Sequence, residues 1–124
     1  MERAKILIVD DDELALEIVT AKLSERYDIV STQDPGSVLR LARENEPDLI
    51  ICDFDMPEMD GGEVSAALLA DEELKYIPLL FFTGLATSGD LNRMRQQLGG
   101  RRAVAKDAPL AQLIARIEEL LKAE

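Results

Sequence analysis

The sequence predicts an α/β fold in which a parallel sheet of five strands is covered by helices on both faces. Short apolar runs rich in β-branched residues alternate with longer amphipathic stretches, and this alternation occurs five times without a repeat or a linker. The 124 residues suit one compact domain, and 47% apolar residues can bury a substantial core. We therefore expect a single domain that spans residues 1–124.

The apolar runs are the expected strands. They cover residues 6–9, 28–31, 49–52, 79–82 and, with a weaker signal, 103–105. Continuously apolar strands between helices are typical of parallel sheets that are buried on both faces. The crossovers must be right-handed. The simplest doubly wound arrangement is the flavodoxin-like strand order 2-1-3-4-5.

Five helices are expected between and after these strands. They begin near Asp12, Asp34, Gly62, Ser88 and Pro109; the first ends near Arg26, the third extends toward Leu74 and the fourth stops at Gly99. The second start combines a capping acid with a proline at the first helical position. The last helix carries one continuous apolar stripe from Leu110 to Leu121.

Composition excludes several classes of function. The formal net charge of −11 repels phosphate backbones and anionic lipid surfaces, so we expect no direct binding of nucleic acid or membrane. The absence of histidine excludes Ser-His and Cys-His catalysis and typical zinc sites. The single cysteine, Cys52, lies in an apolar run and is expected to be a core residue in a reducing, cytoplasmic setting. No apolar stretch approaches the ~20 residues of a membrane span, and the first residues do not resemble a signal peptide.

Polar residues stand where four of the five strands end. The first strand is followed by the acids 10–12, the third by Asp53 and Asp55, the fourth by Thr83-Gly84 and the fifth by Lys106. In open α/β sheets, ligands bind outside the carboxyl ends of the strands. These residues are therefore the candidates for a functional site.

The chemistry of this set favours a divalent cation and a phosphoryl group. Acids at neighbouring strand ends repel one another unless a cation lies among them, and oxygen ligands without imidazole or thiolate suit Mg²⁺. A carboxylate can attack phosphorus to form an acyl phosphate, and an ammonium such as that of Lys106 can neutralise the phosphoryl oxygens from the other side. Thr83 can donate a hydroxyl to the same oxygens, and Gly84 lets the backbone approach them.

Each residue alone has a simpler explanation. Asp12 is expected to be only a helix cap. Lys106 alone would be a solvated surface charge, and Thr83 alone would be an ordinary strand or turn residue. The overall negative charge by itself indicates no more than solubility. The joint pattern at four strand ends carries the prediction.

At this point the sequence resembles the receiver domain of bacterial two-component response regulators. The resemblance covers residues 5–121, and it rests mainly on 6–12, on 47–61 with the phosphorylation strand and its loop, on Thr83-Gly84 and on Lys106. It implies that Asp53 is the phosphoacceptor, that Thr83 and Lys106 hold the phosphoryl oxygens, and that Met56-Pro57 and Gly61 shape the neighbouring loop.

The resemblance also implies a metal site and a mode of signalling. Asp11 and Asp53 would hold Mg²⁺ by side chain, Asp10 would assist through water, and Asp55 would offer its backbone carbonyl. Phosphorylation would move Thr83 and repack the face formed by the fourth helix, the fifth strand and the fifth helix. The partners implied are a sensor histidine kinase or phosphotransfer protein and a downstream target or output domain, with a homodimer as a further option.

The sequence departs from the family at two places. The family usually has proline after the lysine with a cis peptide between them, whereas Lys106 is followed by Asp107-Ala108, and a non-proline cis bond would cost ~3 kcal/mol. The family often carries an aromatic residue three positions before the lysine, where this chain has Ala103. Asp55 also stands where many relatives carry another residue, and it is expected to influence the lifetime of the acyl phosphate.

Three functions therefore compete. The first is a phosphorylation switch that catalyses its own phosphorylation and dephosphorylation without being a conventional turnover enzyme. The second is a degenerate receiver that acts as a phosphorylation-independent binding module. The third is a phosphatase of the haloacid-dehalogenase type, which Asp53-Phe54-Asp55 resembles superficially, although that family has the pair on an early strand of a longer chain. The stimulus, the cognate kinase and the output do not follow from the sequence.

Overall fold

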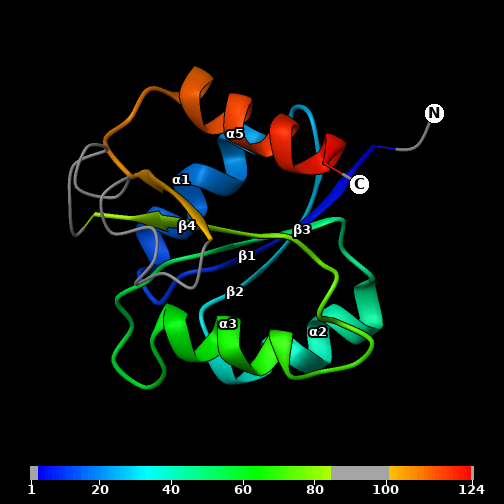
Figure 1. Cartoon of the computed structure of the whole chain (residues 1–124). Helices are drawn as coiled ribbons and strands as arrows, with labels where there is room; N and C mark the ends of the chain where they lie inside the picture. Colours follow the sequence, from blue (N-terminus) through cyan, green and yellow to red (C-terminus); the bar gives the residue numbers. More distant parts are fainter. Residues whose placement is uncertain (1–2, 85–100, 124) are drawn as a thin grey trace.

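The protein is built on one five-stranded sheet (Figure 1). A computed structural model describes residues 3–84 and 101–123. All strand pairs are parallel, and the order is β2-β1-β3-β4-β5, as predicted. The strands are β1 (Lys5–Val9), β2 (Asp28–Thr32), β3 (Leu49–Cys52), β4 (Leu79–Thr83) and β5 (Arg102–Ala105).

Helices cover both faces of the sheet (Figure 1). One face carries α1 (Glu13–Leu23) and α5 (Leu110–Lys122); the other carries α2 (Val38–Asn45), preceded by the short 3₁₀ turn η1 (Pro35–Ser37), and α3 (Gly61–Leu69). The helix expected from about Ser88 to Gly99 lies outside the described residues. Within the described ranges, no helix is long and apolar enough to cross a bilayer.

The sheet separates two apolar cores. Along β1, Leu7 and Val9 point into the core beneath α2 and α3, whereas Ile6 and Ile8 point into the core beneath α1 and α5. This alternation follows from the two-residue period of a strand. All four side chains are fully buried, which explains why the sequence of this strand is continuously apolar rather than alternating.

The helix starts follow from acids that cap them. The Asp12 carboxylate accepts hydrogen bonds from the amides of Leu14 and Ala15, at 3.0 and 3.2 Å, as expected for a cap. Asp60 and Glu63 form a capping box at the start of α3. These caps fix where α1 and α3 leave the carboxyl edge of the sheet.

Three helix boundaries differ from the prediction. The segment after Asp34 begins as a 3₁₀ turn before α2, and α1 ends at Leu23 rather than near Arg26. The third helix ends at Leu69, so Leu74 is not part of it, although Leu74 is buried against the same core. The Asp71 carboxylate accepts hydrogen bonds from the amides of Glu73 and Leu74. These bonds start a separate turn, which competes with continuation of the helix.

Candidate functional site

The two buried acids of the site come from neighbouring strands. Asp10 follows β1 and Asp53 follows β3; the two strands pair in register, with Val9 opposite Cys52. The amide of Asp53 donates to the carbonyl oxygen of Val9 at 2.9 Å, so the pairing continues to the edge of the sheet. Asp10 is 3% exposed and Asp53 is 7% exposed. The fold therefore brings two carboxylates together in a place with little solvent.

A third carboxylate completes an acidic group at this edge. Asp11 is exposed on the turn between β1 and α1. One oxygen from each of Asp10, Asp11 and Asp53 lies within 4.8 Å of the other two. The donors are all carboxylate oxygens, and the nearby Cys52 is buried with its thiol pKa raised mainly by burial, so it remains a protonated core residue as predicted. This donor set fits a hard cation such as Mg²⁺.

Lys106 supplies the positive charge opposite the acids. Its Nζ lies 2.7 Å from Asp10 Oδ2 and 3.6 Å from Asp53 Oδ2. The backbone amide of Lys106 donates to the carbonyl oxygen of Thr83 at 2.8 Å, which holds the end of β5 against β4. No peptide bond within residues 3–84 and 101–123 is cis, so Lys106 reaches the acids with a trans bond to Asp107. The missing proline does not prevent the lysine from entering the site.

The electrostatics of Asp53 follow from burial and from its neighbours. Burial raises the pKa of Asp53 to about 6, the negative charges of Asp10 and Asp11 act in the same direction, and Lys106 and the amide of Phe54 oppose it. For Lys106, burial alone would lower the pKa, but the hydrogen bond to Asp10 and the charges of Asp53 and Asp10 outweigh it and raise the pKa above its ordinary value. The ammonium is therefore retained at neutral pH, while the ionisation of Asp53 is shifted to a higher pH than is usual for an aspartic acid.

The other predicted residues lie at the end of β4 and in the segments that follow β3 and β4. Thr83 is 2% exposed at the end of β4, the strand between β3 and β5. Asp55 is exposed in the loop that follows β3. Among the described residues, a Cβ on Gly84 would meet the Lys106 side chain alone, at 4.0 Å, so no close contact within this part of the chain requires glycine there.

Gly61 has a structural role that the spacing of acids did not reveal. A Cβ at this position would lie 2.7 Å from the Phe81 ring and 2.8 Å from both the Asp53 carbonyl oxygen and the Phe54 Cα. The Gly61 amide donates to the carbonyl oxygen of Phe54 at 2.8 Å, and the Phe54 and Phe81 rings meet edge to face at 5.3 Å. The start of α3 is therefore packed directly on the backbone of Asp53. In the sequence, the aromatic residues 54 and 81 were the signal that could have indicated close packing beside Asp53.

Comparison with known proteins gives one consistent result. Residues 6–118 match the response regulator receiver domain family. The chain is 36% identical over 118 residues to the polar-differentiation response regulator DivK of Brucella ovis, a match that covers 94% of each protein. Its structure resembles that of Vibrio cholerae chemotaxis protein CheY4 with a TM-score of 0.82 and 26% identity, covering 95% of this chain and 98% of the other.

A further solved relative is the signal receiver domain of a signal transduction histidine kinase from Syntrophus aciditrophicus. It has a TM-score of 0.81 and 29% identity, and the alignment covers 98% of this chain and 94% of the other. The family match spans most of the chain, and the sheet order, the acidic group and the lysine agree with the resemblance found in the sequence. The chain is a member of the response regulator receiver domain family.

Proposed function

We propose that this chain is a cytoplasmic phosphorylation switch in which Asp53 accepts a phosphoryl group from a histidine kinase or phosphotransfer protein. The observation that carries the proposal is the convergence of Asp10, Asp11 and Asp53 within 4.8 Å, with the Lys106 ammonium 2.7 Å from Asp10 and 3.6 Å from Asp53. Carboxylates in this number need a cation, and an adjacent ammonium suits a phosphoryl group.

In the proposed reaction, an oxygen of the Asp53 carboxylate forms a bond to phosphorus. The bond from phosphorus to the donor breaks, and the donor nitrogen or oxygen keeps the electron pair. Lys106 stays protonated and neutralises the phosphoryl oxygens on its side, and Thr83 donates its hydroxyl to another oxygen. Asp11 and Asp53 would hold Mg²⁺, with Asp10 assisting and the Asp55 carbonyl as a further ligand. When bound, the ion would neutralise negative charge on the phosphoryl group.

The proposed output is a change of shape within a single receiver domain that spans residues 1–124. A phosphoryl group adds negative charge beside Thr83 and Lys106, which lie at the ends of β4 and β5. The face formed by β5, α5 and the helix expected from the sequence near residues 88–99 would repack in response and bind a downstream protein or output domain. Autodephosphorylation would return the chain to its starting state.

Intact-mass analysis tests the proposal most directly. Wild type and Asp53→Asn are incubated with acetyl phosphate, with Mg²⁺ or with a chelator. We expect one phosphoryl adduct on wild type with Mg²⁺, and none on the variant. A wild-type chain that remains unmodified although it binds Mg²⁺ would instead support the alternative of a degenerate receiver that acts as a binding module. The replacement of the family's aromatic residue by Ala103 is the feature that keeps this alternative open.

A further inference from the structure

Tyr27 joins the segment between α1 and β2 to the last helix. Its side chain is 5% exposed, and its hydroxyl donates to Glu118 Oε2 of α5 at 2.6 Å, across 91 positions of sequence. Burial, the hydrogen bond to Glu118 and the charge of Glu118 together raise the pKa of the phenol to about 12. The hydroxyl therefore keeps its proton at any physiological pH and remains a donor to α5.

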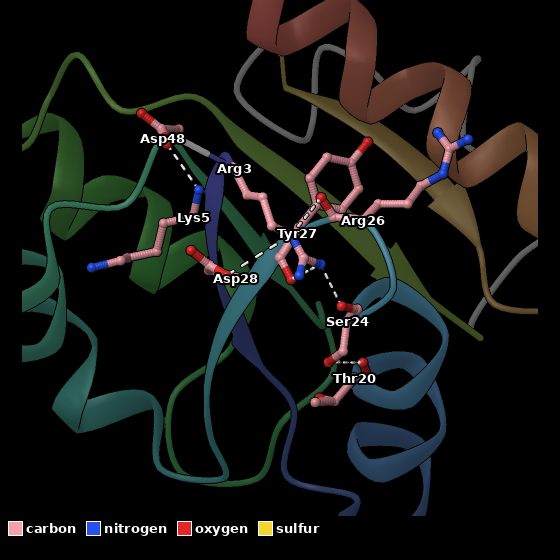
Figure 2. A network of polar contacts seen from close by, with 8 residues as sticks. All are labelled: Arg3, Lys5, Thr20, Ser24, Arg26, Tyr27, Asp28 and Asp48. Atoms are coloured by element: carbon pink, nitrogen blue, oxygen red, sulfur yellow. Dashed lines mark hydrogen bonds and ion pairs between the residues drawn. The ribbon is translucent and has the colours of Figure 1, made fainter. Parts of the chain in front are cut away.

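Arg3 makes the Tyr27 end of this contact rigid (Figure 2). Its guanidinium donates to the carbonyl oxygens of Arg26 at 3.1 Å and Tyr27 at 3.0 Å, and also to that of Ser24. Ser24 is the C-cap of α1, and carbonyl groups at the end of a helix lack partners within the helix and carry partial negative charge. The amide of Asp28 also donates to the carbonyl oxygen of Ala4 at 2.9 Å. Tyr27 thus projects from a segment that is tied to Arg3 and Ala4, the residues just before β1.

The two ends of α5 are anchored differently. Near Glu118, Ile117 is fully buried and lies in the same core as Tyr27 and the fully buried Leu23. At the other end, Leu113 is buried in the same core, but Leu110 is 36% exposed and Pro109 provides no side-chain cap for the helix. A hollow of about 190 Å³ lies between the first turn of α5 and the side of α1. Its lining includes Ile18 and Lys22 of α1, Leu110 and Leu113 of α5, and Lys106.

We propose that α5 pivots about the Tyr27–Glu118 contact, so that its first turns move with Lys106 while the turn that carries Glu118 stays in place. Only Asp107, Ala108 and Pro109 separate Lys106 from the start of α5. The hollow beside Leu110 and Leu113 gives the first turns room to move, whereas the hydrogen bond from the Tyr27 hydroxyl holds the turn that carries Glu118. This inference rests on the proposed function for the signal that moves Lys106, and the pivot itself rests on the contacts of Tyr27.

Amide hydrogen exchange on the untreated full chain tests the pivot without any phosphoryl group. The informative variant is Tyr27→Phe, which removes only the hydroxyl, and its matched control is Tyr76→Phe, the same change on a side chain that is 79% exposed. We expect amides of residues 117–121 to exchange about tenfold faster in Tyr27→Phe, because a hydrogen bond to a charged group is lost, and to be unchanged in Tyr76→Phe. Identical exchange of these amides in both variants overturns the pivot.

The second arm repeats the measurement with acetyl phosphate and Mg²⁺, and records the mass of the same samples. In phosphorylated wild type, we expect exchange to change in residues 110–114 and not in residues 117–121; in Tyr27→Phe, we expect the change to extend to both. A uniform change along α5 in wild type that carries the adduct overturns the pivot. Absence of an adduct refutes the proposed function instead, and the pivot is then decided by the untreated samples.

Discussion

Replacement of Asp53 by asparagine is expected to stabilise the fold at neutral pH in the absence of metal. The pKa of Asp53 rises from 3.8 to about 6 on folding, chiefly because of burial, so ionisation of this acid at pH 7 opposes folding. A rise of this size corresponds to at most about 3 kcal/mol, since one pKa unit is worth about 1.4 kcal/mol. The amide side chain of the variant cannot ionise, and Lys106 keeps its closer partner, Asp10 at 2.7 Å.

The pH dependence gives the sign of this effect. A carboxyl group with a raised pKa in the folded state contributes stability that is fully present below its unfolded pKa and is lost as the pH rises through its folded pKa. Wild type and Asp53→Asn should therefore be equally stable below about pH 4, and they should diverge between pH 4 and pH 6. At pH 7 the variant should melt at a higher temperature, by at most ~10 °C, at roughly 3 to 4 °C per kcal/mol for a chain of this length.

Thermal unfolding in chelator, followed by circular dichroism from pH 4 to pH 8, measures this difference. Asp107→Asn is the control, because it removes the same charge from an exposed position next to Lys106. Saturating Mg²⁺ should raise the melting temperature of wild type and narrow its gap to Asp53→Asn, because a ligand at 100 times its Kd adds about 2.7 kcal/mol. If the two proteins differ by the same amount at pH 4 and pH 7, the assigned cause is wrong.

Three further substitutions test other parts of the structure. Gly61→Ala should lower the free energy of unfolding by about 2 to 4 kcal/mol in urea, because its Cβ would lie 2.7 to 2.8 Å from three fixed atoms, whereas Gly62→Ala, on the exposed side of α3, should cost under about 1 kcal/mol. Glu46→Gly should raise the free energy of unfolding by about 0.5 to 1 kcal/mol, because Glu46 at the end of α2 has a φ of 49°, which glycine adopts more readily. A lower free energy of unfolding would show that the Glu46 side chain matters more than its backbone conformation. Asp55→Asn should lengthen the lifetime of the acyl phosphate about threefold, because a carboxylate accepts a hydrogen bond from the hydrolytic water more strongly than an amide does. The lifetime is measured from the loss of the adduct mass, and an unchanged rate of loss contradicts this role of Asp55.

The fold was predictable because its central strands, β1, β3 and β4, are buried on both faces. Continuous apolar runs such as 6–9 and 49–52 have few structural alternatives when helices separate them, and the order of the strands follows from connection rules. Helix ends were less predictable. Leu74 has the apolar character expected of the third helix, but the Asp71 carboxylate accepts hydrogen bonds from the amides of Glu73 and Leu74 and starts a separate turn, so the helix ends before Leu74. Local hydrogen bonding, not apolar periodicity, determined that boundary.

The composition of the site was also accessible from sequence, whereas its internal contacts were not. The topology alone brings residues that follow β1, β3, β4 and β5 to one edge, so the order of the elements is enough to place Asp53 and Lys106 together. The closer approach of Lys106 to Asp10, at 2.7 Å, than to Asp53, at 3.6 Å, depends on side-chain conformations. The contact of Gly61 with the Asp53 backbone depends likewise on packing between segments that only the fold makes adjacent.

The division of the interior by the sheet has a consequence for how this protein can vary. Each of the β1 residues Ile6 to Val9 contributes its side chain to one layer only, so a change in the layer beneath α2 and α3 does not reach the layer beneath α1 and α5 through shared side chains. Effects of substitutions at distant, unconnected positions are usually additive. Chimaeras that exchange one whole layer with a relative should therefore fold, and they offer a way to transplant one surface without rebuilding the opposite half.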